Sequence, residues 1–312
     1  MLHIRQFIPG QDEEIWVSIH NPCFQDYEDE KTITSDELRL QEKRPTFDDA
    51  GMLIAELDGR PVGICNAFID KFKEERAGYI GALGVIPEFR GQGIAKKLLE
   101  EGLKSLKERG MEKAQTWVEQ GRQACQGLFE GFGFKIVRPY SLMKSPLSEI
   151  KNVGENAEVK MRELRKDSDE DIILYNRLDN ECFKDHHDFR PTKIEETKYR
   201  LLDDPNYTSS GEFFAVLEDE PVGYIGWGID EKYNTEKNKK SGWLLDIGVL
   251  KTYRGKGIGA ALMLYGMKTL RSQGMEEALL YVDDINVTKA LELYEKVGFT
   301  AAKKEIVYLK EL

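Results

Sequence analysis

Short apolar runs bounded by turn residues alternate along this chain with longer stretches of helical spacing. After Gly93 the apolar positions Ile94, Leu98, Leu103 and Leu106 share one helical face, which predicts a helix with a core-facing stripe. Strands are predicted at His3–Phe7, Met52–Leu57, Val62–Ile69, Gly78–Val85 and Ala114–Glu119, and again at Val159–Leu164, Phe213–Leu217, Val222–Trp227, Trp243–Val249 and Ala278–Asp283. This order of elements predicts an α/β fold, made of mixed sheets with helices on their faces.

The chain repeats itself, and the repeat divides it into two similar halves. The segment Asn21–Asp26 returns at Asn180–Asp185, and Phe89–Ile94 returns as Tyr253–Ile258. The offset between copies drifts from 159 to 165 residues and keeps its order, which is typical of a duplicated domain with small insertions. A polar linker follows the first copy, so we expect domains at residues 1–146 and 157–312. In the second copy, the polar run at residues 230–240 predicts a long loop between two strands.

Composition supports a globular protein of about this organisation. The 312 residues are 40% hydrophobic and 32% charged, which is too apolar for disorder and too charged for a membrane protein. No apolar run approaches the roughly 20 residues that span a bilayer, and the first residues lack the apolar core of a secretory signal. We therefore expect a cytoplasmic protein without a membrane partner.

Charge and cysteine content exclude two further classes of protein. The net charge of −11 is shared as −5 in residues 1–150 and −6 in the remainder, so neither half is a basic nucleic-acid module. The four cysteines show no metal-binding spacing, and we expect no metal site. Cys182 and His186 stand four residues apart, which leaves open a thiol nucleophile with a histidine partner.

A glycine-rich loop between a strand and a helix is the strongest chemical signal. It occurs twice, as Arg90–Ala95 and as Arg254–Gly259. Alternate glycines let backbone N–H groups converge, and the helix N-terminus adds positive charge, so each loop is suited to a pyrophosphate. The glycine spacing fits neither a nucleoside-triphosphate P-loop nor a dinucleotide-binding fingerprint.

The loop and the segment after it resemble the GNAT superfamily of N-acetyltransferases. In the second copy the pattern continues from the loop through Asn286 and Ala290 to Leu293-Tyr294 and Gly298-Phe299. The paired loops and the repeated Asn-x-Cys-Phe-x-Asp segment further resemble tandem-domain members such as mycothiol synthase, without implying the mycothiol substrate. The resemblance implies an α/β (α+β) fold of two tandem GNAT-like domains, each a mixed, splayed β-sheet flanked by helices.

The resemblance also implies acetyl-CoA as the acetyl donor. Its pyrophosphate is then expected at the loop, and its pantetheine arm beside the strand that ends at Val249. The coenzyme-binding residues implied in this way are Ile247, Val249, Arg254, Gly255, Lys256, Gly257, Ile258, Gly259 and Asn286, with Val85, Arg90, Gly91, Gln92, Gly93, Ile94 and Ala95 in the first domain.

The two copies differ at the position that the family uses to protonate the leaving thiolate. Tyr294 occupies it in the second copy, whereas the first copy has Phe129, which has no proton to give. Asn286 likewise maps to Gly121. We therefore expect catalysis in the second domain, with a first domain that keeps its coenzyme loop. A buried tyrosine that only packs its helix is the alternative interpretation of Tyr294.

Two residues are candidates to take the proton of the acceptor amine. Asp246 is the only charge in its strand and maps to Ala82, although family members with a strand carboxylate often carry it nearer Trp243. A structural carboxylate is an equal interpretation, and proton loss through water is a third. His186 lies in the polar cluster 185–188 and could titrate near neutrality, with a solvated helix end as its alternative.

The sequence thus predicts a tandem N-acetyltransferase whose second domain acetylates a primary amine, expected to belong to a small molecule. The amine attacks the thioester directly in this hypothesis. Two alternatives use the same loops: an acetyl-CoA-binding regulatory protein without catalysis, and a protein N-terminal acetyltransferase.

Overall fold

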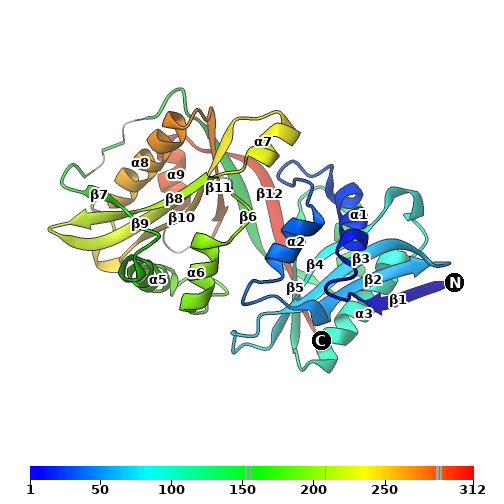
Figure 1. The fold of residues 1–312 in the computed structure, drawn as a ribbon. Coiled ribbons are helices and arrows are strands. Elements are labelled where there is room, and N and C mark those ends of the chain that lie inside the picture. The colour runs from blue at the N-terminus through cyan, green and yellow to red at the C-terminus, as the bar shows by residue number, and fades with distance from the viewer. Residues whose placement is uncertain (152, 155, 208, 286–287, 289) are drawn as a thin grey trace. The chain divides into compact units, whose positions relative to one another are not determined.

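The computed structural model describes residues 1–312 apart from 152, 155, 208, 286–287 and 289. The chain forms two compact units, residues 1–138 with 305–312 and residues 139–304 (Figure 1). Each is a mixed β-sheet with helices, which confirms the predicted α/β class. No helix within the described ranges has the length and apolar character needed to cross a membrane.

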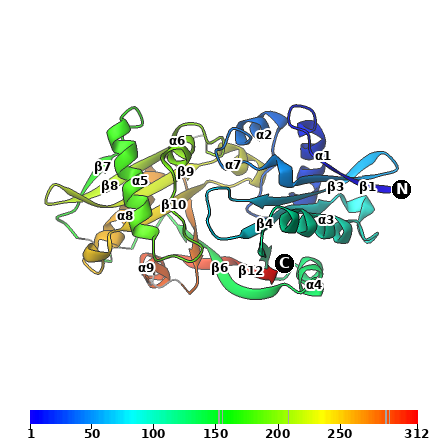
Figure 2. The ribbon, with the colours of Figure 1, turned by 90° about the horizontal axis from the view of Figure 1, so that it is seen from below.

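The first unit has helices on both faces of its sheet. Its strands are β1 (Leu2–Gln6), β2 (Met52–Leu57), β3 (Arg60–Ile69), β4 (Ala77–Val85), β5 (Lys113–Glu119) and the end of β12 (Thr300–Glu311), and its helices are α1 (Glu13–Phe24), α2 (Ser35–Gln41), α3 (Ile94–Glu108) and α4 (Gln123–Gly131). The sheet order is β1-β2-β3-β4-β5-β12, antiparallel except for the β4–β5 pair. Helices α1 and α2 lie on one face and α3 on the other (Figure 2).

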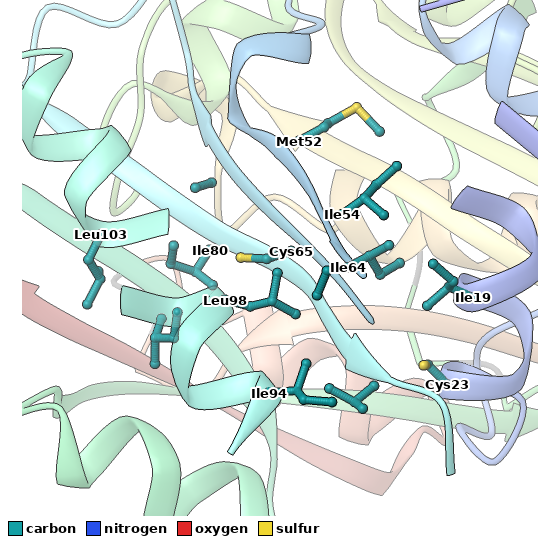
Figure 3. Close-up of a cluster of buried hydrophobic side chains, with 14 of the residues drawn as sticks. Ile19, Cys23, Met52, Ile54, Ile64, Cys65, Ile80, Ile94, Leu98 and Leu103 are labelled. Atoms are coloured by element: carbon teal, nitrogen blue, oxygen red, sulfur yellow. The ribbon is translucent and has the colours of Figure 1, made fainter. Parts of the chain in front are cut away.

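The apolar stripe predicted after Gly93 forms the core beneath α3. Leu98 is fully buried there, and Cys65 and Ile80 project from the sheet toward α3 (Figure 3). On the opposite face Ile19 and Cys23 of α1 cover the sheet. Burying side chains of this size contributes roughly 1.5–3 kcal/mol each.

The second unit repeats this arrangement. Its strands are β6 (Lys135–Pro146), β7 (Lys160–Glu163), β8 (Ser209–Leu217), β9 (Glu220–Ile229), β10 (Ser241–Val249) and β11 (Glu277–Asp283), and its helices are α5 (Asp169–Phe183), α6 (Ile194–Leu202), α7 (Glu231–Lys237), α8 (Ile258–Ser272) and α9 (Ala290–Val297). The sheet order is β7-β8-β9-β10-β11-β6, with β10 and β11 parallel. Figure 1 shows α5 and α6 on one face of this sheet and α8 on the other.

The last strand of each sheet comes from the other sequence copy. Strand β6 precedes residue 146 in sequence, yet it pairs antiparallel with β11 of the second unit. Strand β12, at the C-terminus, pairs with β5 of the first unit. The domain bounds 1–146 and 157–312 follow the sequence repeat and stay a prediction. The compact units have other bounds, because each takes its last strand from the other sequence copy.

The repeated asparagine of the two first helices has a structural role. Asn180 accepts a hydrogen bond from Thr192 N at 2.7 Å and donates to Thr192 O at 3.0 Å. Asn21 makes the same pair of bonds with Ile33, each at 2.9 Å. In each unit this amide fixes the segment that leads into the following helix, α6 or α2.

One prediction about the second unit is wrong. Residues 231–237 of the polar run form helix α7 rather than a loop. Asp230 caps it by accepting a hydrogen bond from Tyr233 N at 2.9 Å, and Asn238 ends it with a left-handed backbone (φ 51°). Buried Tyr233 anchors the helix, a contact that the polar composition of the run concealed.

Candidate active site

Strands β10 and β11 separate in the second unit and open a cleft. They pair in parallel over Ser241–Trp243, and beyond Trp243 their described residues form no further pairs. On its other side β10 shifts register with β9 between Leu244 and Ile247. Such a bulge leaves backbone groups unpaired. The bulge interrupts the alternation of side chains that a regular strand would show along β10.

The cleft holds a cavity of about 690 Å³, within the range of small-molecule sites. Its walls come from the end of β10, the glycine loop, α9 and the segment after α5. Predicted site residues that line it are His186, Asp246, Ile247, Val249, Arg254, Gly255, Gly257, Gly259 and Tyr294. Lys256 and Ile258 are not among its lining residues, and Asn286 lies outside the described residues.

The glycine loop presents the N-terminus of α8 to this cleft. Gly255 and Gly257 both have φ of +77°, a backbone conformation that other residues adopt only with strain. The first bond inside the helix runs from Ala261 N to Gly257 O at 3.1 Å. The three preceding N–H groups have no acceptor within the helix, which is the arrangement that favours an anion. No atom would lie within 4 Å of a Cβ on Gly255, so the loop is open on this side.

Arg254 and the linker hold this loop in place. Arg254 donates from Nε to Val249 O at 3.0 Å and from Nη2 to Cys182 O at 2.9 Å. Asn156 of the linker donates from Nδ2 to Lys256 O at 3.1 Å. Sequence reasoning treated the linker only as a connection, because one polar residue in a polar segment gives no sign of what it will contact.

Tyr294 lies in the cleft on α9. Burial, and then the charge of Asp246, raise the pKa of its phenol to about 12. The phenol is therefore protonated at neutral pH and can donate its proton. The neighbouring Leu293 packs against the start of α8, where a Cβ on Gly259 would lie 3.0 Å from Leu293 Cδ2. This contact sets the distance between the helix that carries the phenol and the glycine loop.

Asp246 lines the cleft and is held from behind by an arginine that the sequence analysis missed. Arg200 on α6 donates from Nη1 to Asp246 Oδ2 at 2.8 Å. Asp179 on α5 lies 3.7 Å from Arg200 Nη2 and accepts a 2.5 Å hydrogen bond from Tyr224. An arginine 46 residues from its carboxylate partner gives no local sequence signal, so only the fold brings them together.

The histidine and cysteine candidates lie beside the glycine loop. Burial, and then the charge of Arg254, lower the pKa of His186 below its ordinary 6.5, so it is neutral at pH 7. Its ring packs on Phe183 with centroids 4.4 Å apart. Burial raises the pKa of the Cys182 thiol to about 12, so this thiol is poorly suited to be a nucleophile.

Comparison with known proteins identifies the family that this architecture serves. Residues 14–134 and 174–299 each match the model of the Acetyltransferase (GNAT) family. The chain belongs to the GNAT family. It is therefore an acyltransferase by family, with the tandem arrangement that the sequence repeat indicated.

Relatives of this GNAT chain include proteins named mycothiol acetyltransferase. One from Thermobispora bispora is 31% identical over 73% of this chain and 75% of its own. One from Renibacterium salmoninarum is 28% identical over 72% of this chain and 65% of its own. With the Streptomyces coelicolor protein of that name, the similarity covers only 42% of each chain.

Solved structures share the tandem GNAT fold. A tandem GNAT protein from the clavulanic acid biosynthesis pathway superimposes with a TM-score of 0.77 at 12% identity, covering 100% of this chain and 98% of that one. A GCN5-related N-acetyltransferase from Sphaerobacter thermophilus gives 0.70 at 20% identity, covering 99% and 95%. At these identities the likeness concerns the fold alone.

The first GNAT unit keeps the loop geometry and differs around it. Gly91 and Gly93 have φ of +77° and +78°, matching the second unit. Phe129, at the tyrosine position, is buried with its ring edge-on to Phe134. Arg122 lies over the ring of Tyr27, 3.7 Å from its centroid. The position of Tyr27 corresponds to that of His186, which lines the cleft in the second unit.

Proposed function

We propose that the second unit is an N-acetyltransferase that moves acetyl from acetyl-CoA to the primary amine of a small molecule. One observation supports this most directly. The protonated phenol of Tyr294 and the open N-terminus of α8 belong to one cleft, so a proton donor and an anion site serve the same bound molecule.

The residues of the cleft fit acetyl-CoA as a substrate. The N–H groups that begin α8 suit its pyrophosphate, and the glycine at position 255 leaves room for phosphate oxygens to approach the backbone. The unpaired edge of β10 from Ile247 to Val249 can pair with the amides of a pantetheine arm. This assigns the loop residues Arg254–Gly259 to binding, with Arg254 acting through the backbone carbonyls that it holds.

The chemistry that this unit would perform needs only positioning and one proton donor. An amine nitrogen in the cleft attacks the thioester carbon, and the C–S bond breaks as the C–N bond forms. The sulfur takes the proton of Tyr294, and a proton leaving the amine restores the phenol. Positioning of the two reactants supplies much of the acceleration in such transfers, and a placed proton donor adds about 10²–10⁴-fold.

A small acceptor is favoured by the cavity and by the relatives. The volume of about 690 Å³ accommodates a coenzyme arm and a compact amine. The relatives named mycothiol acetyltransferase carry a small molecule in that name, which supports this class of acceptor without fixing its identity.

We assign no catalytic role to the first unit. It has Phe129 in place of Tyr294 and Ala82 in place of Asp246, so it offers neither the phenol nor the carboxylate. Its glycine loop keeps the φ values suited to a coenzyme, and binding without turnover is the function we propose for it.

Release of free thiol from acetyl-CoA tests the proposed function. Purified chain is incubated with ethanolamine, glucosamine, tyramine or putrescine, and with a peptide that has a free N-terminus. We expect at least one small amine to accelerate thiol release and to gain 42 Da, roughly one acetyl group, as any amide-forming transfer requires. No acceleration by any of them would overturn acetyl transfer, and acceleration by the peptide alone would indicate a protein acceptor.

A further inference from the structure

A partly buried polar network lies behind the cleft of the second unit, on the side of the sheet covered by α5 and α6. We call Asp246, Arg200, Asp179 and Tyr224 the Arg200 network. Its bonds run from Arg200 Nη1 to Asp246 Oδ2 at 2.8 Å and from Tyr224 Oη to Asp179 Oδ1 at 2.5 Å. Arg200 Nη2 and Asp179 Oδ2 form an ion pair at 3.7 Å between these bonds. Asp246 alone of the four lines the cleft.

The carboxylate of Asp246, which lines the cleft, keeps one oxygen without a hydrogen-bond donor among the described residues. Within the described part of the chain, Oδ2 of Asp246 has Arg200 as its donor, and Oδ1 receives no hydrogen bond. Glu212, 5% exposed on β8, adds a further carboxylate nearby, and its Oε2 is buried without a hydrogen bond from described residues. Asp246 and Asp179 thus flank the guanidinium of Arg200, and Lys166 lies 4.0 Å from Glu212.

The same fold is built without this network in the first unit. By the repeat, Asp246 corresponds to Ala82, Tyr224 to Ile64 and Glu212 to Met52. The strand pairing agrees, because Met52 pairs with Asn66 as Glu212 pairs with Gly226. Ile64 and Met52 are buried in the apolar core there.

Two helix positions complete the contrast. Asp179 corresponds to His20, and Arg200 corresponds to Gln41 when the two helices are aligned from their matching glutamates, Glu196 and Glu37. Asp179 and Tyr224 are buried in this network. Taking polar groups out of water costs energy, and apolar residues of similar size often replace such groups without loss of stability. Stability of the fold therefore does not explain why the second unit carries it.

We propose that Arg200, itself held by Asp179, is a positioning residue that fixes Asp246 as the carboxylate that binds the ammonium form of the acceptor. This inference rests on the proposed function, because it concerns the amine of that reaction. A guanidinium bonded to one carboxylate oxygen restricts the rotation of the carboxyl group, and it leaves the second oxygen to receive an ammonium N–H.

The network also decides what Asp246 does with the amine. Arg200 already donates to one oxygen of Asp246, so the carboxylate can receive an ammonium N–H on its other oxygen and hold the amine by an ion pair. The ammonium then releases one proton to solvent, the nitrogen forms the C–N bond, and Tyr294 protonates the departing sulfur. The amine's next proton restores Tyr294, so one proton leaves per acetyl transferred.

Steady-state kinetics of Arg200→Gln, Arg200→Lys and Asp179→Asn test this role with the panel amine that turns over fastest. We expect Arg200→Gln to raise the KM of the amine at least tenfold, with the KM of acetyl-CoA within twofold of the native value. Arg200→Lys should recover part of that loss, because it keeps the charge and not the fixed geometry. Asp246→Asn should raise the amine KM as much as Arg200→Gln does.

Arg190→Gln is the matched control, because Arg190 forms a similar ion pair with Glu196 on the same face, at 2.6 Å, outside the cleft. It should leave both KM values unchanged. Circular dichroism and thermal melting show whether each variant folds. If Arg200→Gln does not fold, the amine KM of Asp179→Asn provides the test. If the native protein is active and the folded variants keep its amine KM, the role of Arg200 is overturned and the proposed function stands. No turnover in the native protein would overturn the proposed function as well.

The pH profile distinguishes holding the amine from taking its proton. We expect Asp246→Asn to change the amine KM and to leave the pH dependence of kcat in place. Loss of the limb on which kcat rises with pH would instead make Asp246 the proton acceptor, and would contradict the proposed role.

Discussion

The guanidinium of Arg254 donates a hydrogen bond from Nε to the carbonyl oxygen of Val249 at 3.0 Å, and this bond joins the glycine loop to the end of β10. Its Nη2 donates to Cys182 O, which joins the same loop to the end of α5. Two of its donors thus serve the protein's own backbone. The residue that sequence reasoning placed among the coenzyme ligands also builds the site from which the coenzyme would be bound.

We predict that Arg254→Lys lowers the free energy of unfolding by about 2 kcal/mol, because one ammonium cannot satisfy both carbonyls. The KM of acetyl-CoA should rise with it, as the loop loses its attachment. Urea unfolding and initial rates measure the two effects. Arg90→Lys is the control, since Arg90 makes the same bond to Val85 O at 3.0 Å. Arg90→Lys should destabilise the fold without changing the KM of acetyl-CoA. If it raised that KM as much as Arg254→Lys does, the active loop would lie in the first unit.

Tyr294→Phe should lower kcat by about 10²-fold or more, because the leaving sulfur loses its proton donor. The KM of acetyl-CoA should stay within about twofold, since the ring still packs in place. Tyr265→Phe is the control, because Tyr265 packs on Phe213 with centroids 4.7 Å apart and does not line the cleft. Equal rates for Tyr294→Phe and the native chain would mean that Tyr294 only packs α9.

Cys182 should be dispensable for turnover. Burial raises the pKa of its thiol to about 12, so almost no thiolate forms at neutral pH. We expect Cys182→Ala to keep at least about a third of native kcat, with some loss of stability from the buried cavity. Initial rates at varied concentrations of both substrates should give intersecting, not parallel, double-reciprocal lines. Parallel lines, with activity lost in the variant, would restore the acyl-enzyme alternative.

The two loops can be compared by one substitution in each. Gly257 and Gly93 cap their helices with φ near +77°, and alanine in that conformation costs about 1–2 kcal/mol. Gly257→Ala should raise the KM of acetyl-CoA roughly tenfold as the N–H groups of α8 shift, which is about the effect of 1.4 kcal/mol. Gly93→Ala should destabilise the first unit without affecting turnover. The reverse result would assign catalysis to the first unit.

The sequence predicted those parts of the site that depend on local pattern. The strand, the glycine loop and the helix follow one another without interruption between residues 241 and 272, and the φ values of the loop follow from its glycines. The contact of Arg200 with Asp246 has no such local basis, because α6 meets β10 only through the packing of the whole unit. The bulge in β10 was equally hidden, since nothing in Leu244–Ile247 requires a register shift.

Helix α7 and the exchanged strands were missed for related reasons. A run rich in lysine and asparagine is typical of a loop, and one buried tyrosine, Tyr233, changed that outcome through tertiary packing. The apolar pattern of β6 fits an edge strand in either unit, so the pattern cannot say that it pairs with β11. The sequence therefore predicted which residues form strands better than it predicted their partners.

His186 gives the chain a dependence of stability on pH. Burial, and then Arg254, lower its pKa in the folded state below the unfolded value near 6.5. Between those two values the unfolded chain binds more protons, so stability is complete above about pH 6.5 and falls as the pH is lowered. Burial lowers the pKa of His20 in the same direction in the first unit.

We therefore expect the urea midpoint to fall between about pH 7 and pH 5.5, and His186→Asn to reduce that fall. His3→Asn is the control, because His3 lies exposed on β1 and should leave the fall unchanged. An undiminished fall in His186→Asn would mean that the neutral ring contributes nothing. His186→Asn also tests whether His186 takes the proton of the amine. If kcat of this variant no longer rises with pH, His186 is the proton acceptor. An unchanged pH profile of kcat leaves that step to solvent.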